Sequence, residues 1–70
     1  MNERIRNMRE DKDLSQKDMA EILHVSQTTY SDYELGKINI PIQTLIKLAS
    51  FHHTSIDYLL GLTDNPASYQ

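Results

Sequence analysis

The sequence predicts an all-α fold, a single domain of five short helices around one core. Apolar residues recur at intervals of three and four along most of the chain, which is the spacing of one helix face. Ser, Pro and Gly stand between these stretches, where helices begin and end. No stretch alternates apolar and polar residues as a half-buried strand does, and 70 residues leave room for one domain only.

The first helix carries Ile5 and Met8 three positions apart, and the charged run 11–13 ends it. A second helix begins behind Ser15, because Asp18 three positions later completes the pattern of a capping box. In such a box the serine hydroxyl and the carboxylate each accept a backbone N–H of the first turn. The apolar residues behind the cap share one face: Met19, Ala20 and Leu23.

The third helix begins at Ser26, another N-cap, and ends before Gly36, which suits a left-handed helix end. His24 and Val25 make only a short break before it, so a tight turn joins the second and third helices. Such a pair is a helix-turn-helix unit, in which Ala20 is small enough for a close crossing. At about 100° per residue, the inner side of the third helix carries Thr29, Tyr30 and Tyr33.

Pro41 opens a fourth helix, since its missing N–H costs nothing in the first turn. The expected inward stripe of that helix is Ile42, Leu45, Leu48 and Ala49. Ser55 caps a brief fifth helix that Gly61 ends. The expected inward residues of the fifth helix are Ile56, Leu59 and Leu60. Turn formers follow with little to bury, so we expect a domain over 1–63 and a flexible tail over 64–70.

The outer side of the third helix is short and polar, which is unusual for a helix that faces solvent. Its residues are Gln27, Thr28, Ser31 and Asp32. Thr, Ser and Asp each cost roughly a few tenths of a kcal/mol in helix propensity. The same types suit base edges in a major groove, because Gln pairs with adenine, a Thr methyl packs on thymine and Asp accepts from cytosine. The plainer alternative is an ordinary solvated surface.

Composition excludes several classes of protein. With no Cys, neither a disulfide nor a thiolate zinc site holds the fold together. The apolar stretches are too short to span a membrane, and the start MNERIRNMRE lacks the apolar core of a signal peptide. We therefore expect a cytoplasmic protein with no membrane partner. The formal charge of -3 argues mildly against a polyanionic partner.

From Ile5 to Leu60 the chain resembles the phage repressor and Cro-type (XRE-like) helix-turn-helix DNA-binding domains. The matching stretches are RIRNMRED, LSQKDMAEILHVSQTTYSDYELGK, the IP before the fourth helix, LIKLA and SIDYLLG. The resemblance implies a five-helix lambda-repressor-like domain with the helix-turn-helix at its second and third helices. It also implies a transcriptional regulator that binds double-stranded DNA, as a homodimer on a pseudo-palindromic operator.

The resemblance assigns roles to individual residues. Gln16, at the start of the second helix, matches the glutamine that anchors that helix end to a phosphate. The positions that match base-reading residues are Gln27, Thr28, Ser31 and Asp32. The positions that match phosphate contacts are Gln16, Ser26, Lys37 and Asn39. Lys17 is expected to add another, because it is a cation that flanks the proposed reading helix. Arg9 and Glu34 match an ion pair whose role is structural.

Three positions depart from the family's pattern. His24 stands where Gly is common, and a positive φ is strained for His, so the turn is expected to differ slightly. Tyr30 replaces an aliphatic residue, and its hydroxyl needs a partner or the surface. Asp32 repels phosphates, so it either reads cytosine or helps to exclude wrong sites.

Two other function classes stay open beside the DNA-binding regulator. A protein-interaction module, antitoxin-like or antirepressor-binding, would keep the fold without reading DNA, and the acidic charge favours it. An enzyme is not expected, because the chain has no Cys nucleophile, no Gly-rich phosphate loop and no carboxylate pair in a plausible cleft. Whether the chain is a domain of a longer regulator also stays open.

We expect no cofactor, no metal and no small-molecule ligand. His53 and Asp57 lie four apart, but the break before Ser55 spoils the geometry of a metal site, and a third ligand is missing. The acidic balance leaves few cations for phosphates, so binding to DNA is expected to be site-specific, with weak background affinity and a modest dependence on salt.

Overall fold

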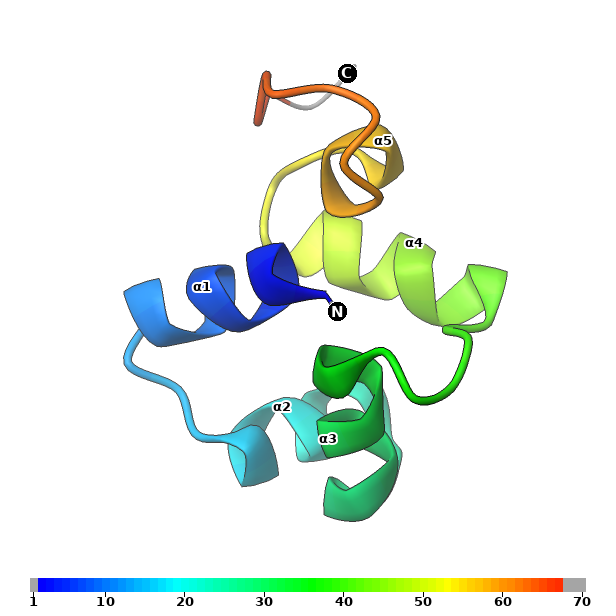
Figure 1. Cartoon of the computed structure of the whole chain (residues 1–70). Coiled ribbons are helices and arrows are strands. Elements are labelled where there is room, and N and C mark those ends of the chain that lie inside the picture. The colour runs from blue at the N-terminus through cyan, green and yellow to red at the C-terminus, as the bar shows by residue number, and fades with distance from the viewer. Residues whose placement is uncertain (1, 68–70) are drawn as a thin grey trace. The chain divides into compact units, whose positions relative to one another are not determined.

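The computed structural model describes residues 2–67, and in that range the chain is all-helical. The helices are α1 (Glu3–Asp11), α2 (Gln16–Leu23), α3 (Gln27–Leu35), α4 (Ile42–Phe51) and α5 (Ile56–Leu59) (Figure 1). The all-α prediction with a helix-turn-helix at the second and third helices is confirmed. The chain divides after Asn39 into two compact units, of which the first holds α1 to α3 and the second α4 and α5.

In the first unit, local caps fix where α2 and α3 begin. Ser15 Oγ accepts the backbone N–H of Asp18 at 3.0 Å, and Asp18 Oδ2 accepts the N–H of Ser15 at 2.9 Å. This reciprocal pair is the predicted capping box. Ser26 Oγ accepts the N–H of Thr29 at 3.1 Å, as predicted for the N-cap of α3. Both helix starts are therefore set by hydrogen bonds that span only three residues.

The turn between α2 and α3 closes on His24, which adopts a left-handed conformation with φ 59° and ψ 43°. Its N–H donates to the Glu21 carbonyl at 3.2 Å, and the N–H of Val25 donates to the Ala20 carbonyl at 3.0 Å. These are the two hydrogen bonds of a Schellman motif, which usually holds Gly at this position. The turn thus has ordinary helix-ending geometry, at a conformational cost of about 1–2 kcal/mol for a residue that is not Gly.

The core of the first unit comes from one face of each helix. α1 and α2 both pack on α3. The buried apolar side chains of this unit are Ile5, Met19, Ala20, Leu23, Tyr30 and Tyr33. The two tyrosine rings meet edge to face with their centroids 6.5 Å apart. The predicted inward face of α3 therefore holds for both tyrosines.

In the second unit, α4 and α5 pack on each other. Leu45, Leu48, Ala49 and Leu59 are buried as predicted. Two predicted core residues are not: Ile42 is 66% exposed and Leu60 is 55% exposed. Ile42 is the first residue of α4 and Leu60 is the C-cap of α5, so each occupies a helix end, where fewer neighbours cover a side chain.

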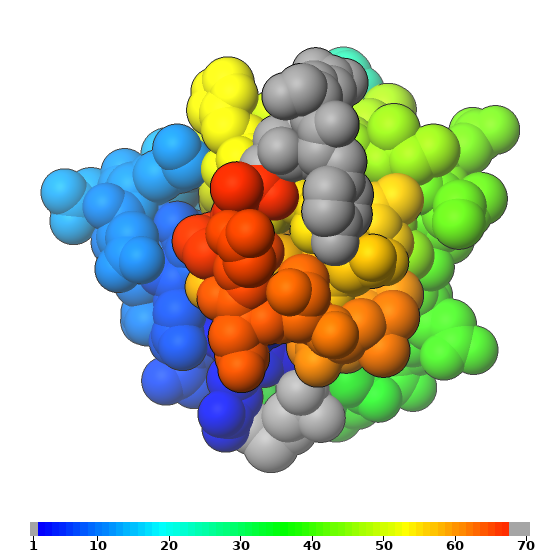
Figure 2. All heavy atoms as spheres, turned by 90° about the horizontal axis from the view of Figure 1, so that it is seen from above, coloured from blue at the N-terminus to red at the C-terminus, as the bar shows by residue number. Residues whose placement is uncertain are grey.

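The segment that follows α5 is tied back to the second unit. The Thr54 hydroxyl, which is buried, donates to the Pro66 carbonyl at 2.7 Å. In Figure 2 the red end of this segment lies beside the yellow residues that precede α5. This hydrogen bond contacts the expected tail at Pro66, within its described part, 64–67. Residues 68–70 of that tail lie outside the described residues.

Candidate nucleic-acid interface

The outer side of α3 borders an open surface groove with a volume of about 370 Å³. Gln27 and Thr28 are exposed at the start of the helix, while Ser31 and Asp32 are half-buried along it. The groove is lined by Gln16, Gln27, Thr28, Ser31, Asp32, Leu35 and Lys37. All four predicted base-reading residues thus lie together on one surface.

The polar groups of this outer face are not used within the chain. Among residues 2–67, no hydrogen bond engages the side chain of Gln27, Thr28, Ser31 or Asp32. The cap of α3 and its buried tyrosines stabilise the helix, and these four side chains add no hydrogen bond to it. Their donors and acceptors are available to a partner.

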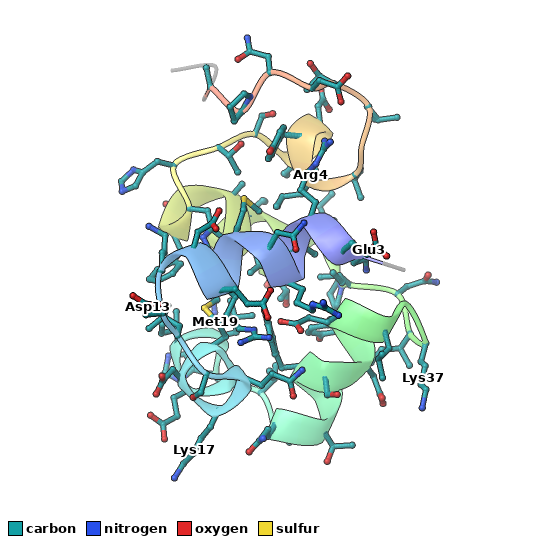
Figure 3. The ribbon with its side chains drawn as sticks, turned by 60° about the vertical axis from the view of Figure 1, so that its left-hand side comes forward. Glu3, Arg4, Asp13, Lys17, Met19 and Lys37 are labelled. Atoms are coloured by element: carbon teal, nitrogen blue, oxygen red, sulfur yellow. The ribbon has the colours of Figure 1, made fainter. Side chains whose placement is uncertain are left out.

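The predicted phosphate contacts are split between the groove and its surroundings. Gln16 and Lys37 line the groove, whereas Lys17, Ser26 and Asn39 are exposed outside its lining. Figure 3 shows Lys17 and Lys37 extending away from the body of the first unit on either side of α3. The hydroxyl of Ser26 is already occupied by the cap of α3, so it has little left to offer a phosphate.

Behind the groove, Arg9 and Glu34 form a two-point ion pair between α1 and α3. Arg9 Nε lies 2.6 Å from Glu34 Oε2, and Arg9 Nη2 lies 3.2 Å from Glu34 Oε1. The side chains are only 12% and 2% exposed, respectively, so this is a buried pair rather than a surface one. Arg9 Nη1 also donates to the Leu14 carbonyl at 2.8 Å, which fixes the loop between α1 and α2.

A second donor reaches the same carboxylate from α2. Gln16 Nε2 donates to Glu34 Oε1 at 3.1 Å. Glu34 therefore accepts hydrogen bonds from Arg9 on one side and from Gln16 on the other, and it connects the three helices of the first unit. We call Arg9, Gln16 and Glu34 the buried polar cluster.

The protonation of the cluster follows from these contacts. Burial raises the pKa of Glu34, but the hydrogen bonds from Arg9 and Gln16, together with the nearby Tyr30 hydroxyl, outweigh burial and leave the pKa below its usual range. The hydrogen bond with Glu34 raises the pKa of Arg9. The carboxylate is therefore ionised at neutral pH, with its charge balanced by the guanidinium.

Tyr30 lies at the edge of this cluster. Its side chain is fully buried, and burial raises the pKa of its hydroxyl far above the usual range. The hydroxyl interacts with the Glu34 carboxylate but falls short of the geometry of a full hydrogen bond. The hydroxyl's expected need for a hydrogen-bond partner is thus met only weakly. Tyr30 stabilises the fold mainly through burial of its ring.

Three features of the first unit were not predicted from the sequence. Asn2 donates from its side chain to the Tyr33 carbonyl at 2.7 Å and from its backbone to the Glu34 carbonyl at 3.1 Å. Leu35, which is 46% exposed, lines the groove among polar neighbours. Gln16 turns toward Glu34. No local pattern in the sequence marks the Asn2 and Gln16 hydrogen bonds, because their partners lie far away in the sequence and on another helix.

Other kinds of site find no support in the described range. Among residues 2–67, no three side chains of His, Asp or Glu gather where they could hold a metal ion. In the same range, no helix combines the length and the apolar character needed to cross a membrane.

Comparison with known proteins identifies relatives of the chain. A family model described as helix-turn-helix matches residues 5–59. From Bacillus subtilis, the uncharacterized HTH-type transcriptional regulator YobD is 34% identical over 64 residues, which cover 91% of this chain and 57% of YobD. The SPbeta prophage-derived uncharacterized regulator YonR is 38% identical over 58 residues, covering 83% of this chain and 54% of YonR.

The HTH-type transcriptional regulator ImmR of the same organism is 33% identical over 61 residues, covering 87% of this chain and 48% of ImmR. The chain thus spans about half the length of these curated relatives. No solved structure gives a significant match.

Proposed function

Because the chain belongs to the phage repressor and Cro-type (XRE-like) helix-turn-helix family of transcriptional regulators, we propose that it binds specific DNA sequences through α3. The family implies a DNA partner and a regulatory rather than an enzymatic role. In the proposal, α3 enters the major groove and its outer side chains contact base edges. The protein acts in the cytoplasm, where the DNA of a prokaryotic cell or its phage is accessible.

One observation carries the proposal: the outer face of α3 groups four polar side chains that have no partner among the described residues. A major groove about 12 Å wide accepts an α-helix, and base edges offer the donors and acceptors that these side chains lack. In the proposal Gln27 pairs with adenine and the Thr28 methyl packs on thymine. Asp32 accepts from the amino group of cytosine, with Ser31 as a supporting contact.

Phosphate contacts orient the helix in the groove without reading sequence. In the proposal these come from Gln16 at the start of α2, from Lys17 and Lys37 on either side of α3, and from Asn39. Ser26 contributes through the N-terminus of α3 rather than through its hydroxyl, since that hydroxyl caps the helix. The few cations involved predict weak nonspecific binding, in keeping with the net charge of -3.

The operator is proposed to be a pseudo-palindrome read by a homodimer. Two copies related by a two-fold axis would place their reading helices about 34 Å apart, one turn of B-DNA.

The test is selection of bound DNA from a random duplex library with the purified chain. Recovery of a pseudo-palindrome whose half-sites lie one helical turn apart supports the proposal. The logarithm of the association constant, plotted against that of the salt concentration, should then fall with a shallow slope. A slope equivalent to about ten phosphates neutralised by Lys or Arg contradicts the proposed mode, in which the cations of each chain are Lys17 and Lys37. Failure to enrich any sequence favours a protein-interaction module with the same fold.

A further inference from the structure

Gln16 is the only residue that belongs to both the buried polar cluster and the lining of the groove. Its side chain is half-buried, with the amide nitrogen 3.1 Å from Glu34 Oε1. Its position at the start of α2 places it beside the outer face of α3 in the groove. Whatever fixes this amide therefore also fixes part of the proposed DNA-binding surface.

The chemistry of Glu34 determines which way the amide points. An ionised carboxylate can only accept hydrogen bonds, so the NH2 group of Gln16, and not its carbonyl, must face Glu34. One of the two N–H bonds is used in this contact. The second N–H and the carbonyl oxygen remain, with both attached to a side chain whose rotation is restrained.

Arg9 makes this arrangement compatible with a nearby phosphate. An uncompensated carboxylate behind the groove would repel an anion and would be costly to bury. The two-point contact from Arg9 balances that charge, while leaving Oε1 able to accept from Gln16 as well. The buried polar cluster can therefore orient a donor without adding net negative charge beneath the surface.

We propose that Glu34 is a positioning residue for DNA recognition: it orients the Gln16 amide so that its second N–H donates to one backbone phosphate. This inference rests on the proposed DNA-binding function and assigns Glu34 a role in recognition beyond its ion pair with Arg9. Pre-orientation strengthens the contact because less side-chain freedom is lost when DNA binds.

The experiment uses the operator obtained by selection, with each phosphate in turn replaced by a neutral methylphosphonate. For the wild-type chain, one substitution per half-site should weaken binding about tenfold through the loss of the Gln16 contact. The Gln16→Leu variant should bind about tenfold more weakly and lose its sensitivity at that phosphate alone. In the Glu34→Gln variant only one oxygen remains, and Arg9, which contacts both carboxylate oxygens, competes for it with Gln16. This variant should therefore show less than about threefold sensitivity there, while other phosphates keep their effects.

Two further variants separate positioning from stability. Ile5→Val removes part of a buried side chain but leaves the cluster intact, so it should keep the full tenfold sensitivity. The double variant Arg9→Met, Glu34→Met removes both charges together, which a fold tolerates better than the loss of one. Provided that circular dichroism shows it folded, it should repeat the loss seen with Glu34→Gln.

Full sensitivity at the Gln16 phosphate in the folded double variant, which has no carboxylate or amide oxygen at position 34, overturns the positioning role. So does a wild-type chain in which no phosphate depends on Gln16. Failure of the proposed function is a different result, because then the wild-type chain selects no sequence from the library and the phosphate scan has no starting point.

Discussion

Helix α3 carries polar side chains on two faces, and these differ in whether the chain itself satisfies them. On the inner face, Glu34 is buried and accepts hydrogen bonds from Arg9 and Gln16. On the outer face, Gln27 and Thr28 are exposed and have no side-chain hydrogen bond within the described range. Polarity on the inner face thus stabilises the fold, whereas polarity on the outer face is available for an external partner.

The largest expected effect comes from breaking the inner face. Replacing Glu34 by Ala leaves the Arg9 guanidinium buried without its partner, and we expect the free energy of unfolding to fall by about 3–5 kcal/mol. Urea denaturation followed by circular dichroism measures this loss. Asp32→Ala on the same helix is the matched control and should change stability by no more than about 0.5 kcal/mol. Equal losses for the two variants would mean that the faces do not differ in this way.

The next effect concerns the outer face alone. The double variant Gln27→Ala, Thr28→Ala should lose roughly a hundredfold in affinity for the selected operator, because each good base contact contributes about 1–3 kcal/mol of discrimination. Its unfolding midpoint should match that of the wild-type chain, and binding to unrelated DNA should change little. Fluorescence anisotropy with labelled duplexes measures both affinities.

The control for that variant is Asn7→Ala, which changes an exposed polar residue of α1 and should leave both affinities unaltered. Unchanged operator affinity in the Gln27, Thr28 variant would remove α3 as the reading element. It would favour a partner other than DNA for this face.

The two faces also differ in how far the sequence predicts them. Helix starts at Ser15 and Ser26 are predictable because the capping hydrogen bonds span three residues. The grouping of Gln27 and Thr28 on an outer face follows from helical periodicity. The bond between Gln16 and Glu34 joins residues 18 positions apart on different helices, so no local pattern could indicate it.

Periodicity also gave too large a core in the second unit. Periodicity identifies which face of a helix is apolar, but not at which residue neighbouring side chains cease to cover that face. Ile42 and Leu60 both lie at helix ends and are exposed. The resemblance to a family supplied the pairing of Arg9 with Glu34. Only the structure shows that Gln16 donates to the same carboxylate and that Asn2 donates to the Tyr33 and Glu34 carbonyls at the end of α3.

A smaller effect should follow from acid. The folded-state pKa of Glu34 lies below its unfolded value of about 4.3, so its stabilisation is present above about pH 4.3 and is lost as pH falls through the folded pKa. Urea midpoints measured across that window should fall less steeply for Glu34→Gln than for the wild-type chain. Asp18 also has a lowered pKa, because it accepts hydrogen bonds from Ser15, so Asp18→Asn serves as the separate control.

Alkali should act on the same inner face through Tyr30. Its folded-state pKa is raised by burial, so the stabilisation is complete below the unfolded value of about 10 and declines as pH rises above it. Tyr30→Phe should abolish that decline while it keeps the buried ring. A wild-type chain equally stable at pH 8 and pH 11 would contradict the buried, neutral state of this hydroxyl.

The smallest effect tests the turn that sets the angle between α2 and α3. His24 has φ 59°, a conformation that Gly adopts without strain, so His24→Gly should stabilise the chain by about 0.5–1 kcal/mol after the greater flexibility of the unfolded chain is counted. Gly36→Ala is the reciprocal control, because Gly36 has φ 73° at the end of α3 and should lose a similar amount. Urea denaturation measures both changes. If His24→Gly instead lowers stability, the imidazole itself contributes to the turn. If it lowers operator affinity, the imidazole contributes to DNA binding and the DNA-binding surface extends beyond α3.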